Sequence, residues 1–316
     1  MRDSVAAEND VLPPPPAADA AVTIHAPAKL NLGLRVFPRR PDGFHDIESW
    51  FVPISLCDTL IFQQSDALTL TLSGLASGLS AVPEDNLVGR AAIALAKAAK
   101  VEPRANIHLH KLIPAGGGLG GGSSDAAATL LALRQLWNLS LGAAELLALA
   151  VQLGSDVPFF IHGQSAICRG RGERITPLPL PRLLFAVLVI PPYGTSTKEV
   201  YQTFDYQPPS PETAAINWEE LACQEAAHIS DAIRNDLEAS AFAVTPALRD
   251  LSYEMRAITN RPVHVSGSGS TLFILADQPA AAESLADSLQ QALHKDMRVV
   301  PVQIEKSAGE LQCPNN

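Results

Sequence analysis

The sequence predicts a mixed α+β fold in which strands and helices follow one another without a regular βαβ alternation. Three observations lead to this expectation. Apolar residues alternate in the manner of strands at residues 26–34 and again at 106–113. Between these stretches, the alanine-rich residues 86–100 carry apolar side chains at helical spacing. A run of glycines then separates the second strand from another helix.

The composition excludes several classes of partner. Of the 316 residues, 47% are hydrophobic and 18% are charged, which is typical of a globular protein large enough for two domains. The formal net charge of −10 argues against nucleic acid or an anionic membrane as the main partner, because both attract basic surfaces. The strongest apolar run, residues 185–190, is far too short to cross a membrane and suits a buried strand.

The two ends of the chain are expected to be tails. Residues 1–21 are rich in proline and lack the basic start and apolar middle of a signal peptide, so we expect a disordered tail there and a second one at 307–316. The cysteines show no CxxC pair and predict reduced thiols in a cytoplasmic protein. They are Cys57, Cys168, Cys223 and Cys313.

The first part of the chain predicts a strand at residues 22–34 and a loop at 38–43. A second strand is expected from the end of this loop to about residue 60, and a third at 68–72. The helix at 86–100 and the strand at 106–113 come next. A helix is expected at about 124–137, and Ser140 is expected to cap another that ends near Gly154. Prolines at 177, 179 and 181 indicate a domain joint, which predicts domains at 22–180 and 181–306.

The second part predicts a buried strand at 185–190, a polar loop to about residue 217 and then two helical stretches. A turn with the sequence Gly267-Ser268-Gly269-Ser270, here called the second glycine turn, lies between strand-like residues 263–265 and 272–275. This turn is either a plain hairpin or an element that supports or faces a phosphate site.

The glycine loop, from Pro114 to Asp125, carries the main functional signal. Its glycines lose much backbone entropy on folding, a cost that anion binding explains. Without side chains, successive backbone N–H groups can converge on phosphate oxygens, and the start of the next helix adds its positive dipole end. Ser123 and Ser124 add hydroxyl groups for a phosphate or for Mg²⁺.

Two familiar phosphate motifs fit this loop poorly. The pattern GxxxxGK[ST] fails because no lysine precedes Ser123. The dinucleotide pattern GxGxxG is matched by Gly116, Gly118 and Gly121, but the preceding strand contains His108, His110 and Lys111 and is too polar for a central parallel strand. A flexible linker is also disfavoured, because a helix with an apolar stripe follows at once.

Several separated segments resemble the GHMP kinases, which include galactokinase, homoserine kinase and mevalonate kinase. They are the glycine loop, residues 27–32 (PAKLNL), 40–45 (RPDGFH), 156–160 (DVPFF) and the second glycine turn. In this order they are most similar to the family members that act on a methylerythritol linked to cytidine diphosphate in isoprenoid precursor synthesis. Residues 235–238 (NDLE) also match the family, without a physical role that the sequence reveals.

The resemblance implies a two-domain α+β fold, with an N-terminal domain like ribosomal protein S5 and a C-terminal ferredoxin-like domain, and an active site in the cleft between them. It implies a kinase that uses ATP and Mg²⁺ to phosphorylate a small-molecule hydroxyl, the 2-hydroxyl of the methylerythritol unit. A monomer or homodimer without nucleic-acid or membrane partners is expected. The alternative is a sibling GHMP kinase for another alcohol, such as homoserine.

Asp156 and Lys29 match the catalytic pair of the family. A carboxylate beside the acceptor hydroxyl can take or orient its proton, and a lysine can offset charge on the transferring group. The alternatives are a helix cap for Asp156 and a solvent-facing strand residue for Lys29. Asn31 shares the strand face of Lys29 and matches a substrate-binding asparagine.

Phe44 and His45 match an aromatic–histidine pair that binds cytosine, with Phe where the family often has Tyr; Tyr201 is a candidate second stacking residue. The turn at residues 170–173 resembles one that lines the cytidyl pocket through its backbone, and Arg171 is an additional charge there. Asn86 matches a residue near adenine but equally suits a helix N-cap. Ser124 is the candidate Mg²⁺ ligand. The resemblance assigns ATP binding to Asn86 and to Pro114, Gly116, Gly117, Gly118, Leu119, Gly120, Gly121, Gly122, Ser123 and Ser124.

Overall fold

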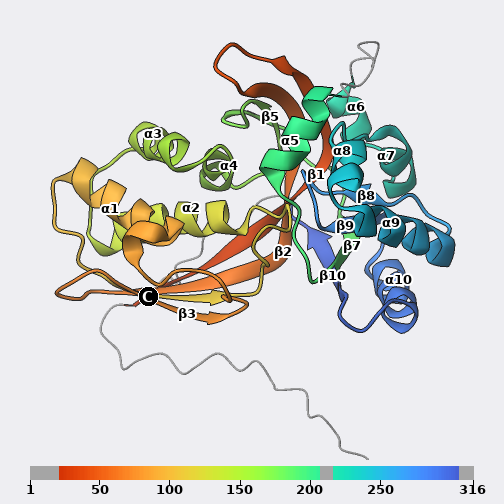
Figure 1. Cartoon of the computed structure of the whole chain (residues 1–316). Helices are drawn as coiled ribbons and strands as arrows, with labels where there is room; N and C mark the ends of the chain where they lie inside the picture. The colour runs from red at the N-terminus through yellow and green to blue at the C-terminus, as the bar shows by residue number, and fades with distance from the viewer. Residues whose placement is uncertain (1–20, 207–215, 306–316) are drawn as a thin grey trace, which may run out of the picture.

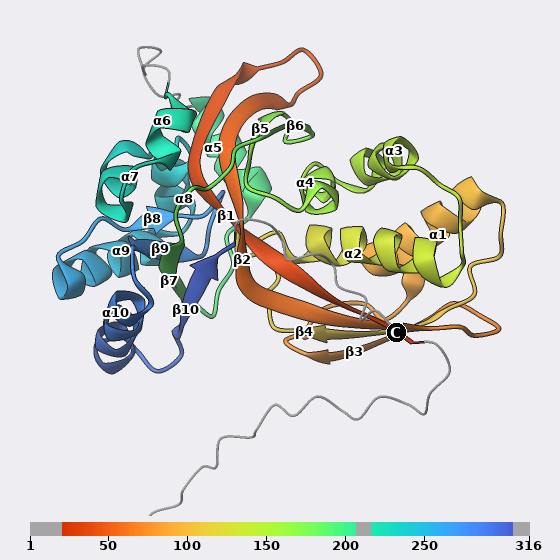
Figure 2. The same cartoon turned by 180° about the vertical axis from the view of Figure 1, so that it is seen from behind.

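The computed structural model describes residues 21–206 and 216–305. The predicted tails, apart from Ala21, therefore lie outside the described residues. Two long antiparallel strands, β1 (Val22–Arg39) and β2 (His45–Gln63), cross the middle of the molecule and separate the helices of its two halves (Figures 1 and 2). No helix in the described part of the chain is long and apolar enough to cross a membrane.

The strands form one ten-stranded sheet with the path β3-β4-β2-β10-β7-β9-β8, to which β1, β5 and β6 attach at the side. The two halves of the sheet meet where β10 pairs with β2 at Ile304 and Ile54. The further strands are β3 (Thr69–Gly74), β4 (Asn106–Lys111), β5 (Ala166–Gly170), β6 (Arg174–Pro177), β7 (Leu184–Ile190), β8 (His264–Val265), β9 (Leu272–Ala276) and β10 (Arg298–Ile304).

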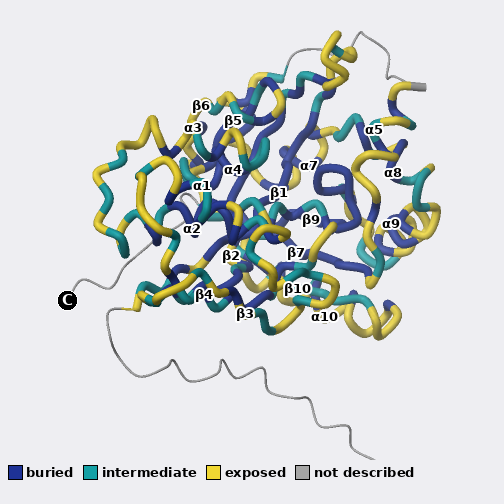
Figure 3. The backbone as a smooth tube through the Cα atoms, turned by 60° about the vertical axis from the view of Figure 1, so that its left-hand side comes forward, coloured by how far each residue is buried: buried dark blue, intermediate teal, exposed yellow. Residues whose placement is uncertain are grey.

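The N-terminal half packs helices α1 to α4 on the sheet around a core that includes Phe51, Leu60 and Leu130. The C-terminal half has a separate core between β7, β9 and helices α8 to α10. Buried residues run along the long strands, and exposed ones gather in the outer helices and turns (Figure 3). The helices are α1 (Leu87–Ala99), α2 (Gly121–Leu136), α3 (Ala143–Leu153), α4 (Val157–His162), α5 (Thr197–Tyr206), α6 (Trp218–Ala222), α7 (Ala226–Ala232), α8 (Glu238–Val244), α9 (Pro246–Thr259) and α10 (Pro279–Ala292).

Most predicted elements are present, including the alternating strand before the glycine loop. There, Ile107, Leu109 and Ile113 are fully buried. This strand, β4, pairs in parallel with β3 and antiparallel with β2. It therefore does not lie within a doubly wound parallel sheet, the setting that dinucleotide binding requires.

Three predictions about secondary structure were wrong. The polar loop expected up to residue 217 contains helix α5. This helix is stabilised because Val200 and Phe204, at i, i+4 spacing, are buried. The two helical stretches expected beyond it are four, α6 to α9. Ser140 does not cap α3: the N-cap is Gly142, whose N–H donates to the Glu145 carboxylate over 2.8 Å.

Helix α2 begins at Gly121, three residues earlier than expected from helix propensity. Gly120 is its N-cap, with a left-handed φ of 71°. Two glycines and Ser123 thus form the first turn, and the end of the glycine loop is itself the start of a helix. This places the positive end of the α2 dipole at the loop, as the phosphate-binding hypothesis requires.

Candidate active site

Lys29 and Asp156 lie together although they are far apart in sequence. Lys29 belongs to β1, where Ala28 and Leu30 point to the opposite face and are fully buried. The Lys29 Nζ lies 3.9 Å from Asp156 Oδ2, at the start of α4. It also lies 4.8 Å from the centre of the Phe51 ring. Lys29 is 4% exposed, so it is not a solvent-facing strand residue.

The Asp156 carboxylate is available for chemistry. Asp156 occupies the N-cap position of α4, but its side chain makes no capping hydrogen bond. Proline in the first turn of this helix leaves fewer backbone N–H groups in need of a cap. The side chain is 30% exposed and faces Lys29, which is the arrangement of a group that can reach a ligand.

Burial lowers the pKa of Lys29, and the charge of Asp156 offsets part of this effect. Asn31 holds the ammonium from the same strand: Lys29 Nζ donates to Asn31 Oδ1. The Asn31 amide in turn donates to Ser49 Oγ over 2.9 Å. Both ends of the amide are engaged, so Asn31 positions Lys29, and its contact with substrate stays a prediction.

The glycine loop is fixed to β1, and to the two residues that flank the second glycine turn, by three hydrogen bonds. Lys29 N–H donates to the carbonyl of Leu119 over 2.9 Å. Thr271 N–H donates to Gly117 O and Ser266 Oγ to Gly118 O, both over 3.1 Å. Leu119 itself is buried in the core, so the loop is anchored at its centre. The second glycine turn therefore supports the loop.

Gly118 shows why this loop needs glycine. Its φ of 76° is left-handed, and a Cβ atom there would lie 2.2 Å from the Ser266 carbonyl oxygen. At Gly120, with φ of 71°, a Cβ would lie 3.1 Å from Lys29 Cγ. Side chains at these positions would push the loop off its support or displace the candidate catalytic lysine.

A pocket of about 530 Å³ joins the candidate catalytic pair to the predicted cytosine-binding residues. Lys29, Asn31 and Asp156 line it together with Phe44, His45 and Tyr201. Gly118 and Gly120 of the glycine loop also line it, as do Gly267 and Ser268 of the second glycine turn. The structure thus brings both predicted ends of the site into one cavity.

The aromatic end of this pocket contains His45 and Tyr201, whose ring centres lie 5.5 Å apart at an angle of 34°. Burial, and then the charge of Asp156, raise the pKa of the Tyr201 hydroxyl to about 12. Phe44 is 49% exposed at the same end, an unusual place for a large apolar side chain. An exposed ring beside a pocket is available for stacking on a ligand.

Asp205, at the end of α5, is a pocket residue that the sequence did not reveal. Its Oδ1 lies 3.0 Å from His45 Nε2, and its Oδ2 lies 3.4 Å from the Arg39 guanidinium. His45 Nδ1 lies 2.8 Å from the carbonyl oxygen of Phe37. Both ring nitrogens are therefore held, and the orientation of His45 is fixed.

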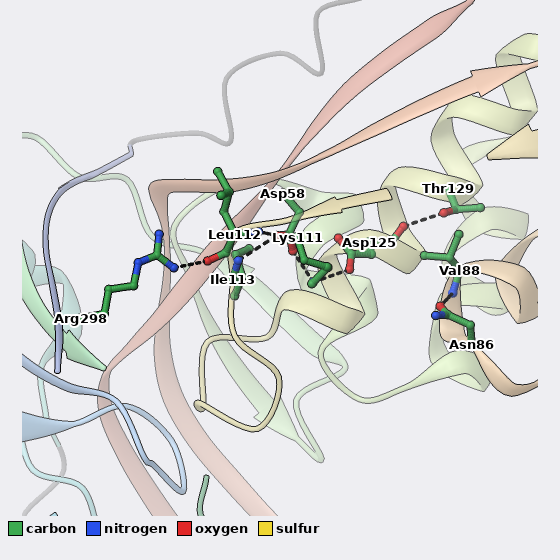
Figure 4. A network of polar contacts seen from close by, with 9 residues as sticks. All are labelled: Asp58, Asn86, Val88, Lys111, Leu112, Ile113, Asp125, Thr129 and Arg298. Carbon is green, nitrogen blue, oxygen red and sulfur yellow. Dashed lines mark hydrogen bonds and ion pairs between the residues drawn. The ribbon is translucent and has the colours of Figure 1, made fainter. Parts of the chain in front are cut away.

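A second unpredicted feature is a buried cluster of Asp58, Lys111 and Asp125 at the two ends of the glycine loop, where β4 leads into it and α2 follows it (Figure 4). Lys111 Nζ donates to Asp58 Oδ2 and, over 2.7 Å, to Asp125 Oδ2. Asp58 Oδ1 also accepts from the backbone N–H groups of Leu112 and Ile113, at 2.6 and 2.8 Å. The cluster ties β2, the end of β4 and the start of α2 together on either side of the loop.

The three charges of this cluster act on one another at short range. Burial raises the pKa of Asp125 to about 8, although Lys111 opposes the shift. Burial by itself would lower the pKa of Lys111, but the charges of Asp125 and Asp58 outweigh this effect, and the pKa of Lys111 is raised. One ammonium cannot neutralise two buried carboxylates, so the pair of carboxyl groups favours retaining one proton between them. The sequence signal was weak: Lys111 looked like one more polar residue of an alternating strand.

Asn235, whose role is not evident from the sequence, supports the second glycine turn. Its Nδ2 donates to the carbonyl oxygens of Val265 and Gly267, over 2.8 and 2.7 Å. The neighbouring Asp236 accepts from the N–H of Val36 over 2.9 Å. This segment therefore fastens the turn to β1.

Asn86 is the N-cap of α1. Its Oδ1 accepts from the Val88 N–H over 3.0 Å, and its Nδ2 donates to the Ser80 carbonyl over 2.8 Å. The capping interpretation is thus confirmed, and a contact between Asn86 and adenine stays a prediction. Ser124 is buried and its hydroxyl has no hydrogen-bond partner among the described residues.

Comparison of the chain with known proteins shows the family to which it belongs. Residues 86–164 match the GHMP kinases N terminal domain, and residues 217–295 match the GHMP kinases C terminal domain. A 4-diphosphocytidyl-2-C-methyl-D-erythritol kinase from Salinispora tropica is 40% identical over 283 residues, which cover 87% of this chain and 90% of the relative. The chain belongs to the GHMP kinases.

Further relatives agree with this assignment. A 4-diphosphocytidyl-2-C-methyl-D-erythritol kinase from Pelotomaculum thermopropionicum is 40% identical over 270 residues, with 84% of this chain and 92% of the relative covered. A crystal structure of 4-(cytidine 5'-diphospho)-2C-methyl-D-erythritol kinase superposes with a TM-score of 0.72 at 37% identity, covering 90% of this chain and 99% of that one. A homoserine kinase from Cytophaga hutchinsonii, at 18% identity and a TM-score of 0.69 over 93% of this chain and 98% of its own, shares the fold alone.

The family confirms the predicted two-domain GHMP kinase fold. It also makes this chain a small-molecule kinase that uses ATP. The domain limits at 22–180 and 181–306 stay predictions; their boundary falls between β6 and β7. A monomeric or homodimeric state and a cytoplasmic location likewise stay predictions.

Proposed function

We propose that this GHMP kinase transfers the γ-phosphoryl group of ATP to the 2-hydroxyl of 4-diphosphocytidyl-2-C-methyl-D-erythritol, in the non-mevalonate route to isoprenoid precursors. The observation that carries the proposal is the pocket that joins Lys29 and Asp156 to Phe44, His45 and Tyr201. A substrate with a pyrimidine at one end and the reacting hydroxyl at the other suits this pocket. The alternative acceptor, homoserine, has no ring to place against the aromatic end.

The glycine loop is the proposed cradle for the triphosphate of ATP. Its left-handed glycines turn the backbone of residues 116–120, and the first turn of α2 follows directly. Backbone N–H groups at a helix start bind phosphate oxygens well, because they lack partners within the helix and lie at its positive end. In the overall acidic chain, this local dipole supplies the attraction for an anion.

In the proposed reaction, the acceptor oxygen attacks the γ-phosphorus in line with the bond to the leaving ADP. The new O–P bond forms as the bond between the γ-phosphorus and the bridging oxygen breaks, and the electron pair leaves with ADP. The proton of the acceptor hydroxyl passes to Asp156. The Lys29 ammonium lies 3.9 Å from that carboxylate, close enough to offset negative charge on the transferring group.

Mg²⁺ is the proposed companion of ATP, and the residues present fit a metal that arrives with the phosphates. Among the described residues there is no group of three or more His, Cys, Asp or Glu that could hold a metal ion. Mg²⁺ prefers oxygen ligands and is commonly held by substrate phosphates, water and one or two protein groups. The Ser124 hydroxyl, in the first turn of α2, has no hydrogen-bond partner within residues 21–206 and 216–305 and is the protein oxygen we assign to it. When bound, Mg²⁺ neutralises part of the triphosphate charge.

The proposal is tested by measuring ADP release with ATP and Mg²⁺ and a panel of acceptors. We expect turnover with 4-diphosphocytidyl-2-C-methyl-D-erythritol and none with homoserine or mevalonate. Transfer to the 2-hydroxyl is checked by phosphorus NMR of the product. Turnover with homoserine alone would retain the kinase fold and refute the cytidyl pocket.

A further inference from the structure

Arg171 is a pocket residue whose side chain has no place in the function described so far. It lies in the turn between β5 and β6 and lines the pocket of about 530 Å³. Its backbone N–H donates to Glu173 Oε2 over 2.7 Å, so that carboxylate is engaged with the turn itself. The guanidinium is the part that faces the pocket residues.

The guanidinium of Arg171 spans the two ends of the pocket. Its Cζ lies 4.1 Å from the centre of the Phe44 ring, a cation–π contact that occupies one face of that ring. Its Nη2 lies 3.5 Å from Ser155 Oγ, beside the candidate base Asp156. Arg171 therefore lies between the aromatic end and the reacting end.

Among the described residues, no ion pair compensates the charge of Arg171. Lys29 and Arg39, two other cations of this pocket, are paired with Asp156 and Asp205. Lys198, from the first turn of α5, and Arg171 have no ion pair within the described part of the chain. Of these two, Arg171 is the one in contact with residues at both ends of the pocket.

We propose that the Arg171 guanidinium binds the diphosphate of the cytidyl substrate and so sets specificity for a nucleoside diphosphate over a nucleoside. This inference rests on the proposed function. With the base at Phe44 and Tyr201 and the reacting hydroxyl at Asp156, the diphosphate must cross the space between them. A planar guanidinium presents two parallel N–H donors to phosphate oxygens, and the cation–π contact with Phe44 helps to hold the group in position.

The first test compares KM and kcat for the cytidyl substrate in wild type, Arg171→Gln and Arg171→Lys. Arg174→Gln is the matched control, because it removes the same charge from the neighbouring strand outside the pocket. We expect Arg171→Gln to raise KM by about 10- to 100-fold, the loss of one charge-assisted hydrogen bond, while Arg174→Gln changes it less than about threefold. Lysine restores the charge but not the two parallel N–H donors, so the KM of Arg171→Lys should lie between those of wild type and Arg171→Gln.

The second test separates a diphosphate contact from mere support of Phe44. The affinities of CDP and of cytidine are measured by calorimetry for wild type and Arg171→Gln. We expect wild type to prefer CDP and the variant to lose at least about tenfold of that preference, with cytidine affinity nearly unchanged. Equal weakening of both ligands, or a KM no different from that of Arg174→Gln, would overturn the proposal. Failure of wild type to phosphorylate the cytidyl substrate would instead refute the proposed function, and the CDP comparison would still decide the role of Arg171.

Discussion

Replacing Lys111 by methionine should destabilise the protein strongly, because the substitution breaks the buried cluster at the two ends of the glycine loop. Asp58 and Asp125 are 0% and 2% exposed, so neither can be solvated without opening the core. Asp58 would keep two backbone N–H donors. Asp125 would lose its one ammonium partner, and its Oδ1 already lacks a hydrogen bond among the described residues.

The expected loss of unfolding free energy follows from these buried contacts. Removing one partner of a buried ion pair typically costs about 3–5 kcal/mol, because the remaining charge stays buried. Without the charge of Lys111, which opposes the shift, the pKa of Asp125 rises further, and its protonation relieves part of the penalty near neutral pH. We therefore expect a loss at the lower end, about 3 kcal/mol of unfolding free energy.

The assay is urea unfolding at pH 7, followed by the KM for ATP in the same variant. Lys295→Met is the control, since Lys295 is exposed in the loop before β10 and should matter by less than about 0.5 kcal/mol. The KM for ATP should rise in Lys111→Met because the contact that joins the two ends of the loop is lost. A stability loss of less than about 1 kcal/mol, or one equal to that of Lys295→Met, would refute this account of the cluster.

Three further predictions concern the loop, the lysine and the pocket. Gly118→Ala should lower kcat/KM for ATP at least about tenfold, because its left-handed φ and a clash with the Ser266 carbonyl oxygen add about 1–3 kcal/mol of strain. Steady-state kinetics test this. The control is Gly78→Ala, which has a similar φ but open space around it and should leave activity unchanged. Because burial lowers the pKa of Lys29 below 10.5, its charge is lost as pH rises through that lowered value, and kcat should fall there; a pH–rate profile of Lys29→Arg should show this limb moved to higher pH. Asp205→Asn should raise KM for the cytidyl substrate about three- to tenfold by releasing His45, with KM for ATP unchanged, and an equal rise in both would contradict the assigned role.

Much of the site could be predicted from sequence because its residues lie in local motifs. The glycine loop is recognisable as a candidate phosphate-binding loop because packing an apolar core does not require so many glycines. Lys29 and Asp156 were found by resemblance, and the structure brings them to within 3.9 Å of each other. Their roles in catalysis stay predictions.

Other features depend on contacts between distant segments, which one sequence does not show. Asp58 and Lys111 are 53 residues apart, and nothing near either indicates a partner. Helix α5 was missed because few of its residues are apolar, and its stability comes from burying Val200 and Phe204 against the C-terminal core. Asp205 was missed with it, because a charged residue at the end of an unrecognised helix looks like ordinary surface.

The most direct test of the central claim is the turnover number of Asp156→Asn with ATP and the cytidyl substrate. The amide keeps the shape of the carboxylate but cannot take the proton of the acceptor hydroxyl. The account predicts a kcat at least about 100-fold below wild type, with the affinities for ATP and substrate, measured by calorimetry, within about threefold. A kcat close to wild type would contradict the assignment of Asp156 as the base.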